Sequence, residues 1–357
     1  MNLAFPDELR MLGAQAQRLF ADRNARAAAR RALDGEIDYD RELWREMGAL
    51  GWLAIAIPEA YGGLDLGPKA VCVLAEQLGR SLAAVPFSTV VYLALPAILH
   101  GGSEGQKRAL LPRIADGSLV VGFADGGARA TVRDGRLSGR NLFTSEGTIA
   151  DLAVIAARDE AGDACFCLLD MAAPGVVRRE AARIDLSRDY ALINAENVPV
   201  EPLGNAAVVA QVLDRAPILF AFEQLGGAVA SMELARDYAL TRHAFGRPIG
   251  SFQAIKHKLA RMFVANEIAR SNAYFGAWAL SSGSEDILEA AMVARISAIR
   301  AYDYAAREGV EIFGALGFTW EADCHLYVRR AKQLALMMGG ELRCGDRLIA
   351  QLMARHR

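Results

Sequence analysis

Cationic side chains gather at the break between two long helical patterns, where they could bind a phosphate. Gly246 and Pro248 end a pattern of apolar residues that recurs at three- and four-residue spacing over residues 218–240. A second helical pattern follows, with Ser251 placed as its N-cap. A helix start offers unpaired backbone N–H groups and the positive end of the helix dipole. Three cations nearby suit a phosphate or pyrophosphate: Arg242, Arg247 and Lys256.

The order of residues at this break resembles a family signature. The stretch has the sequence Arg242-His-Ala-Phe-Gly-Arg-Pro-Ile-Gly-Ser-Phe-Gln-Ala-Ile-Lys-His257. Its physical features alone also fit an ordinary helix corner with a solvated cationic rim. The pattern Arg-x-x-Phe-Gly-x-Pro-Ile-x-x-Phe-Gln-x-Ile-x-His, however, is similar to the C-terminal signature of acyl-CoA dehydrogenases, flavoproteins that desaturate acyl-CoA thioesters. The resemblance implies that Arg242, Phe245 and Gln253 contact FAD, usually the FAD bound by a neighbouring subunit.

The elements around this signature change in character twice along the chain. Helical periodicity prevails up to about Ser118, short alternating runs follow to about Leu203, and helices then return. We therefore predict three domains, residues 1–118, 119–203 and 204–357. The fold class is α+β, and the family resemblance implies a helical N-terminal domain, a β-barrel-like middle domain and a C-terminal four-helix bundle.

Five strands are predicted in the middle domain, with Asp134-Gly135 at a hairpin turn. They are Leu119–Ala124, Ala130–Arg133, Arg136–Leu142, Leu152–Ala157 and Cys165–Leu169. At the end of the third, Phe143 and Thr144 stand where the family places a side chain and a hydroxyl near the isoalloxazine ring. The Thr144 hydroxyl could instead cap a local turn.

Two further segments resemble family loops that touch the flavin, and both carry substitutions. After Phe123, this chain has Ala-Asp-Gly where relatives have a Thr-Glu-Pro-like loop. In the last domain, the segment around Gly314 resembles one that approaches the FAD pyrophosphate of the partner subunit. Here Glu311 replaces glutamine and Ala315 replaces glycine. A carboxylate repels a diphosphate unless a cation intervenes, and the added methyl restricts close backbone approach.

Desaturation of an acyl-CoA requires a base that removes the proton α to the thioester. The resemblance places that carboxylate at position 340 or 216, which are Gly340 and Ala216 in this chain. Glu341, next to paired glycines, and Glu223, on an otherwise apolar helix, are the alternative bases. Each also has a structural interpretation: Glu341 as a helix-start carboxylate, and Glu223 as the partner of an arginine across the bundle. The remaining interpretation is that the chain is no competent dehydrogenase alone.

The resemblance implies an FAD-dependent acyl-CoA dehydrogenase that passes electrons to an electron-transfer flavoprotein. The alternative is a degenerate partner subunit, as in heteromeric enzymes of steroid side-chain degradation, which the segment from Gly317 to Tyr327 resembles. We expect a homo- or hetero-oligomer, a dimer or tetramer, in lipid or steroid catabolism. A third possibility is the same fold acting on another substrate, such as a nitroalkane.

Composition excludes several other classes. A formal net charge of −2 gives no reason to expect nucleic-acid binding. The five cysteines are scattered and odd in number, which argues against a disulfide framework or a metal site and favours a reducing cytoplasm. We predict no signal peptide. The apolar run from Leu82 to Leu99 contains Pro86 and Pro96, so we predict a buried wall and no membrane span.

Overall fold

The computed structural model describes residues 4–355 and groups them into two units. Unit 1 comprises the described parts of Met1–Ala27 and Pro217–Arg357 together with Cys72–Ala83. Unit 2 comprises Ala28–Val71 and Ala84–Ala216. The fold has helical N-terminal and C-terminal parts and a central sheet, as predicted. The division into three domains stays a prediction, because the units divide the N-terminal helices between them.

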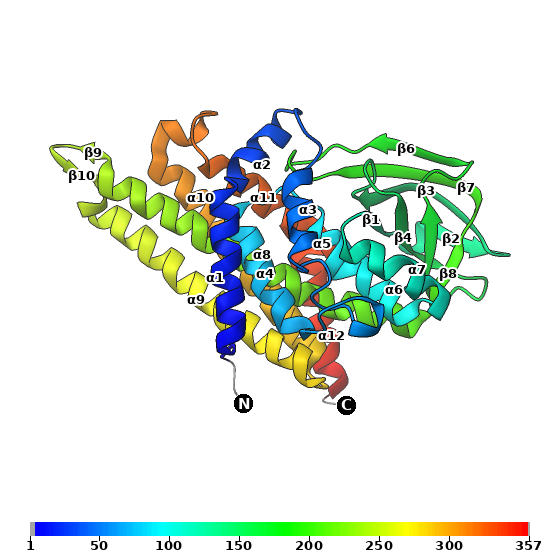
Figure 1. The fold of residues 1–357 in the computed structure, drawn as a ribbon. Helices are drawn as coiled ribbons and strands as arrows, with labels where there is room; N and C mark the ends of the chain where they lie inside the picture. Colours follow the sequence, from blue (N-terminus) through cyan, green and yellow to red (C-terminus); the bar gives the residue numbers. More distant parts are fainter. Residues whose placement is uncertain (1–3, 356–357) are drawn as a thin grey trace. The chain divides into compact units, whose positions relative to one another are not determined.

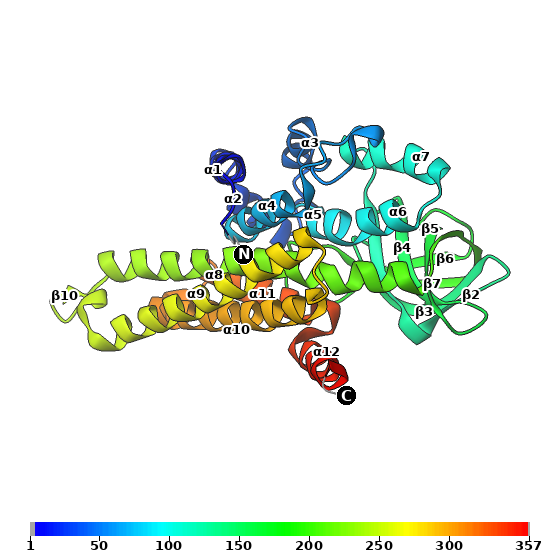
Figure 2. The same ribbon diagram turned by 90° about the horizontal axis from the view of Figure 1, so that it is seen from below.

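Unit 1 is a helical bundle with α10 at its centre. α10 packs against α9, α11 and α12, and buries alanines at three- and four-residue spacing, which lets neighbouring helices approach closely (Figure 2). The elements lying wholly or mainly in unit 1 are α1 (Asp7–Asp22), α4 (Gly67–Ser81), α8 (Ala206–Thr241), β9 (His243–Ala244), β10 (Arg247–Pro248), η4 (Ile249–Ser251), α9 (Gln253–Ser282), α10 (Ile287–Phe313), η5 (Gly314–Phe318), α11 (Cys324–Leu336), η6 (Met337–Gly339) and α12 (Gly340–Arg355).

α8 and α9 are joined by the β9–β10 hairpin at one end of unit 1 (Figure 1). Phe245 and Gly246 lie at its tip with φ of 52° and 80°, the left-handed pair that a tight hairpin turn needs. The predicted N-cap at Ser251 is wrong. Phe252 occupies that place without a side-chain cap, because the Ser251 hydroxyl donates to the Pro248 carbonyl instead.

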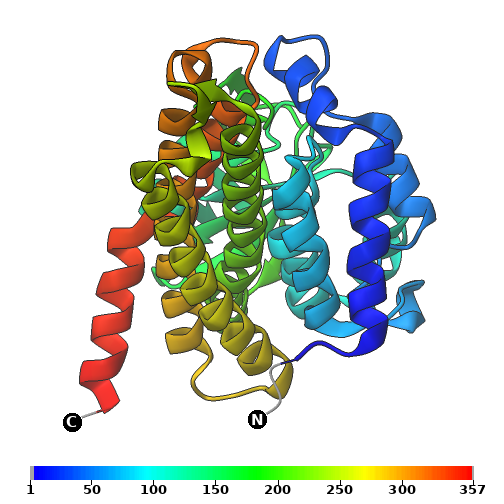
Figure 3. The same ribbon diagram turned by 90° about the vertical axis from the view of Figure 1, so that its left-hand side faces the viewer.

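Close contact between α4 and α8 fixes the environment of Glu223. A Cβ atom on Gly79 would lie 1.7 Å from the Glu223 carbonyl oxygen, and one on Gly226 would lie 1.8 Å from the Glu76 carbonyl oxygen. Both positions therefore exclude any side chain. Figure 3 shows these two helices running side by side within unit 1.

Unit 2 is built on an eight-stranded sheet of order β6-β7-β3-β1-β4-β5-β8, with β2 paired to β3 and β4. The strands are β1 (Val121–Asp125), β2 (Ala130–Arg133), β3 (Arg136–Ser145), β4 (Leu152–Arg158), β5 (Ala164–Asp170), β6 (Val176–Glu180), β7 (Tyr190–Pro199) and β8 (Glu201–Gly204). The five predicted strands are confirmed with shifted ends. The Asp134-Gly135 hairpin turn is confirmed too, with φ of 47° and 69°. Sequence analysis missed β6 to β8.

The helices of unit 2 include the predicted buried wall. Residues 87–101 form a short α-turn, a π-helical turn and a helix, and most of them are buried. The helical elements wholly or partly in this unit are α2 (Ala25–Leu33), α3 (Arg41–Ala49), η1 (Glu59–Tyr61), α5 (Phe87–Thr89), η2 (Val90–Ala94), α6 (Leu95–Gly101), α7 (Glu104–Ala115) and η3 (Gly127–Arg129). Within residues 4–355, no helix has both the length and the apolar character needed to cross a membrane.

Candidate functional site

The β9–β10 hairpin presents a cation and an aromatic ring to solvent. Phe245, at the tip, is 95% exposed, and the exposed Arg242 side chain contacts no other described residue through a hydrogen bond or ion pair. The hairpin backbone is nevertheless fixed, because the Ile249 N–H donates to the Arg242 carbonyl at 2.8 Å. Arg247 stacks over the Phe252 ring, 4.2 Å from its centroid. The predicted flavin contacts at positions 242 and 245 thus lie together on an accessible turn that is closed by a backbone hydrogen bond.

Gln253 is the exposed first residue of α9, directly after this hairpin. On the same helix, Lys258 forms ion pairs with Glu308 and Glu311 of α10. The hydrogen bond from Lys258 lowers the pKa of Glu311, and the two carboxylates raise the pKa of Lys258. The substitution at position 311 therefore comes with a neighbouring cation, a lysine that sequence analysis did not identify.

Gly314 and Ala315 follow Glu311 and are both exposed at the start of η5. Gly314 has φ of 63° and ψ of −139°, a backbone conformation essentially restricted to glycine. Ala315 keeps its methyl group on the surface of this turn. Both residues are accessible to a ligand, and their contact with a diphosphate stays a prediction.

The candidates on the central sheet lie in different environments. Thr144 is buried and its hydroxyl donates to the Leu142 carbonyl, two residues back along β3, at 3.0 Å, and its contact with a flavin stays a prediction. Phe143 is 37% exposed and stacks on Tyr190, with ring centroids 4.9 Å apart. Phe123 is a core residue, only 4% exposed, and packs edge-on against Phe166, so the structure offers no ligand-facing surface on its ring.

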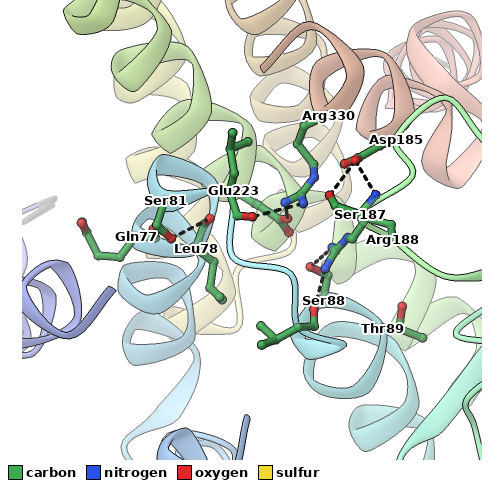
Figure 4. A network of polar contacts seen from close by, with 12 residues as sticks. Gln77, Leu78, Ser81, Ser88, Thr89, Asp185, Ser187, Arg188, Glu223 and Arg330 are labelled. Carbon is green, nitrogen blue, oxygen red and sulfur yellow. Dashed lines mark hydrogen bonds and ion pairs between the residues drawn. The ribbon is translucent and has the colours of Figure 1, made fainter. Parts of the chain in front are cut away.

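Glu223 is buried in unit 1 and forms an ion pair with Arg330 (Figure 4). Each side chain is 1% exposed, and the distance from Arg330 Nη1 to Glu223 Oε1 is 3.7 Å. A second Arg330 nitrogen lies 3.5 Å from the Leu82 carbonyl oxygen. The pair joins α8 to α11, as the structural interpretation of Glu223 predicted. Sequence analysis did not identify Arg330, because a buried arginine carries no local signal.

Arg295 ties the turn before α12 to the bundle. Its buried guanidinium donates to the Gln224 side chain and to the Leu334 and Met337 carbonyls, which end α11. Burial lowers the pKa of Arg295 to about 10. Three consecutive left-handed residues follow, Met338, Gly339 and Gly340. The buried guanidinium of Arg295 therefore holds the chain in place just before the turn that carries position 340.

Positions 340 and 216, where the family resemblance places the catalytic base, carry no carboxylate in this chain. The backbone at position 340 has a conformation that favours glycine. Gly340 has φ of 71° and ψ of −168°, a region essentially closed to other residues. Ala216, at the other position where the family places its base, is 1% exposed. Glu341 lies in the first turn of α12 and pairs with Arg300, with a nitrogen–oxygen distance of 2.7 Å. The structure thus places both alternative carboxylates, Glu223 and Glu341, in ion pairs.

We predict that Gly340→Ala lowers the free energy of unfolding by about 1–3 kcal/mol, because alanine is strained at this φ and ψ. The Cβ atom would also lie 3.0 Å from the Ala335 carbonyl oxygen. Urea denaturation followed by circular dichroism measures the change. Gly345→Ala is the matched control on the same helix, where a Cβ atom meets nothing within 4 Å and stability should rise slightly. Equal effects of the two substitutions would contradict a glycine-specific turn.

Metal chemistry has no evident centre in this site. Within residues 4–355, no group of three or more histidine, cysteine, aspartate or glutamate side chains is placed to hold a metal ion. All five cysteines are free, and four of them are buried. The side chains that could act on a ligand lie on the β9–β10 hairpin, at the exposed end of α10 and in the turn before α12.

Comparison with known proteins matches both helical parts of the chain. Residues 6–118 match the acyl-CoA dehydrogenase N-terminal domain and residues 206–343 the C-terminal domain. Acyl-CoA dehydrogenase IpdE2 of Mycobacterium tuberculosis is 32% identical over 93% of each chain. Two solved structures each superpose with a TM-score of 0.90: the Tcur3481-Tcur3483 steroid ACAD G363A variant (30% identical, 98% of each chain) and the ChsE4-ChsE5 complex of M. tuberculosis (25% identical, 99% of each chain). This chain therefore belongs to the acyl-CoA dehydrogenase family.

Proposed function

We propose that this chain is a subunit of an FAD-dependent acyl-CoA dehydrogenase that desaturates a CoA thioester between its α and β carbons. The observation that carries the proposal is the hairpin, which exposes Phe245 and the Arg242 guanidinium, a cation with no anionic partner among the described residues. A solvent-facing cation beside an exposed aromatic ring suits the diphosphate and ring system of a dinucleotide. Electrons would leave through an electron-transfer flavoprotein.

The residues of the hairpin and of the start of α9 fit the negative charge of the FAD diphosphate. Arg242 and the start of α9 supply positive potential, with Gln253 available for hydrogen bonds. Glu311 would repel a diphosphate, and Lys258 offsets that repulsion only in part because it is shared with Glu308. When bound, FAD supplies the acceptor for the hydride that leaves the β carbon. The chain's own residues would bind and orient it.

We further propose that the proton from the α carbon is removed by a companion subunit. In this chain Glu223 is paired with Arg330, Glu341 is paired with Arg300, and position 340 has a glycine-only backbone. Each of these carboxylates is held by an arginine, so it would have to leave that ion pair to reach the α carbon of a substrate. The two solved structures named above are each named for two proteins, Tcur3481-Tcur3483 and ChsE4-ChsE5. The first is described as a steroid ACAD and the second as a complex. A bulky, steroid-like acyl group is the substrate class we favour.

A second candidate function is a dehydrogenase that is active alone. It is favoured by Glu341, which follows three left-handed residues and is partly exposed. A small rearrangement of that turn would redirect its carboxylate.

The test is an anaerobic titration of the separately purified chain with acyl-CoA thioesters, following the flavin absorption band. We expect no bleaching by the chain alone and bleaching once a companion carrying a carboxylate base is added. Bleaching by the chain alone, abolished by Glu341→Gln, would overturn the companion-base proposal and establish the second candidate. Failure to take up FAD in any assembly would overturn the flavin proposal itself.

A further inference from the structure

One lysine is shared by two carboxylates at the exposed end of α10. Lys258 of α9 pairs with both Glu308 and Glu311, which are neighbours on the surface of α10 because three residues are close to one helical turn. The closest other cation along α10, Arg307, already pairs with Asp303. We call Lys258, Glu308 and Glu311 the Lys258 cluster. It holds one positive and two negative charges, so one negative charge stays uncompensated.

The two carboxylates of the Lys258 cluster differ in their exposure to water. The Glu308 side chain is 17% exposed, whereas the Glu311 side chain is 60% exposed. Water solvates both partners of an exposed ion pair, so such a pair is held weakly. Glu311 can therefore release Lys258 at a smaller cost than Glu308 can. The hydrogen bond from Lys258 lowers the pKa of Glu311, so this carboxylate is ionised at neutral pH.

The Lys258 cluster lies at the same end of unit 1 as the β9–β10 hairpin (Figure 2). Tyr238, in the last turns of α8 before the hairpin, stacks on Phe313 at the end of α10, with ring centroids 4.1 Å apart. Lys258 follows Gln253 by five residues on α9, which is about 7.5 Å along the helix axis. Glu311 comes just before the exposed turn of η5. The cluster therefore borders the surface on which we place the FAD diphosphate.

We propose that Lys258 leaves Glu311 and pairs with a diphosphate oxygen when FAD binds, while Glu308 keeps the lysine in place. This inference rests on the proposed function and assigns Lys258 and Glu311 a part in setting the affinity for the cofactor. An ammonium group has three donors, so Lys258 can pair with Glu308 and with a phosphate oxygen at the same time. Glu311, once it has lost its cation, repels the diphosphate and lowers the affinity.

Removing the charge of Glu311 tests the repulsion. Glu311→Gln should tighten FAD binding by about 3- to 10-fold, because the carboxylate no longer competes for Lys258 or repels the diphosphate. Quenching of FAD fluorescence by the assembled protein measures the affinity. Glu289→Gln is the matched control: Glu289 pairs with Arg355 on the same helix, about 33 Å away along its axis and beyond the reach of a screened charge. Equal affinities of wild type and Glu311→Gln, or equal gains in both variants, would overturn the inference.

A second test asks whether Lys258 contacts the cofactor or only balances its two carboxylates. Lys258→Met should weaken FAD binding about 10-fold in the wild-type background. It should also weaken binding in a chain that already carries Glu308→Gln and Glu311→Gln, where no carboxylate of the cluster is left to balance. Loss of the Lys258→Met effect in that background would overturn the contact with the diphosphate.

The same titrations separate this inference from the proposed function on which it rests. FAD uptake by the wild-type assembly with an affinity that none of these substitutions changes would overturn the role of the Lys258 cluster alone. Failure of the wild type and of every variant to take up FAD would overturn the flavin proposal together with it.

Discussion

Glu223→Gln is expected to lower the free energy of unfolding by about 3–5 kcal/mol. The carboxylate and Arg330 are each 1% exposed, so neutralising Glu223 removes a charge that compensates a guanidinium shielded from water. Glutamine keeps the size of the side chain, which confines the change to the charge. Urea denaturation followed by circular dichroism measures the loss. A change below about 1 kcal/mol would show that the pair contributes little to the fold.

Two further variants separate this ion pair from others in the chain. Glu341→Gln should change stability by less than about 1 kcal/mol, because the Glu341–Arg300 pair is exposed to solvent. The double variant Glu223→Met with Arg330→Met should recover most of the stability that Glu223→Gln loses, since both charges of this pair are then removed. A double variant as unstable as the single one would assign the loss to packing.

Arg242→Ala is expected to weaken FAD binding by about 10- to 100-fold, the effect of losing charge-assisted hydrogen bonds to a phosphate. Stability should stay within about 0.5 kcal/mol of wild type, because the side chain is exposed and has no partner among the described residues. Quenching of FAD fluorescence by the intact assembly measures the affinity.

The matched control for this prediction is Arg236→Ala. Arg236 is an exposed arginine on the same helix whose guanidinium pairs with the neighbouring Asp237. It should leave FAD affinity unchanged. If Arg242→Ala and Arg236→Ala behaved alike, the hairpin would have no special part in binding the cofactor.

Local patterns in the sequence were sufficient for most of the architecture. Alternation predicted β1 to β5, and the left-handed Asp134-Gly135 turn followed from residue types alone. The signature motif located the hairpin that exposes Arg242 and Phe245. β6 was missed because it is an exposed edge strand rich in charge, Val-Val-Arg-Arg-Glu, without an alternating pattern. The N-cap of α9 was not predicted correctly, because the Ser251 hydroxyl donates to the Pro248 carbonyl.

The sequence by itself determined which carboxylates had to be considered, and only the tertiary structure decided what surrounds them. Glu223 meets Arg330, Glu311 meets Lys258 and Glu341 meets Arg300. The partners in each pair lie on different helices. Helical and strand periodicity depend on neighbours within a few residues, so they can be recognised along the chain. An ion pair between distant residues depends on how helices pack, and that is fixed by the whole core.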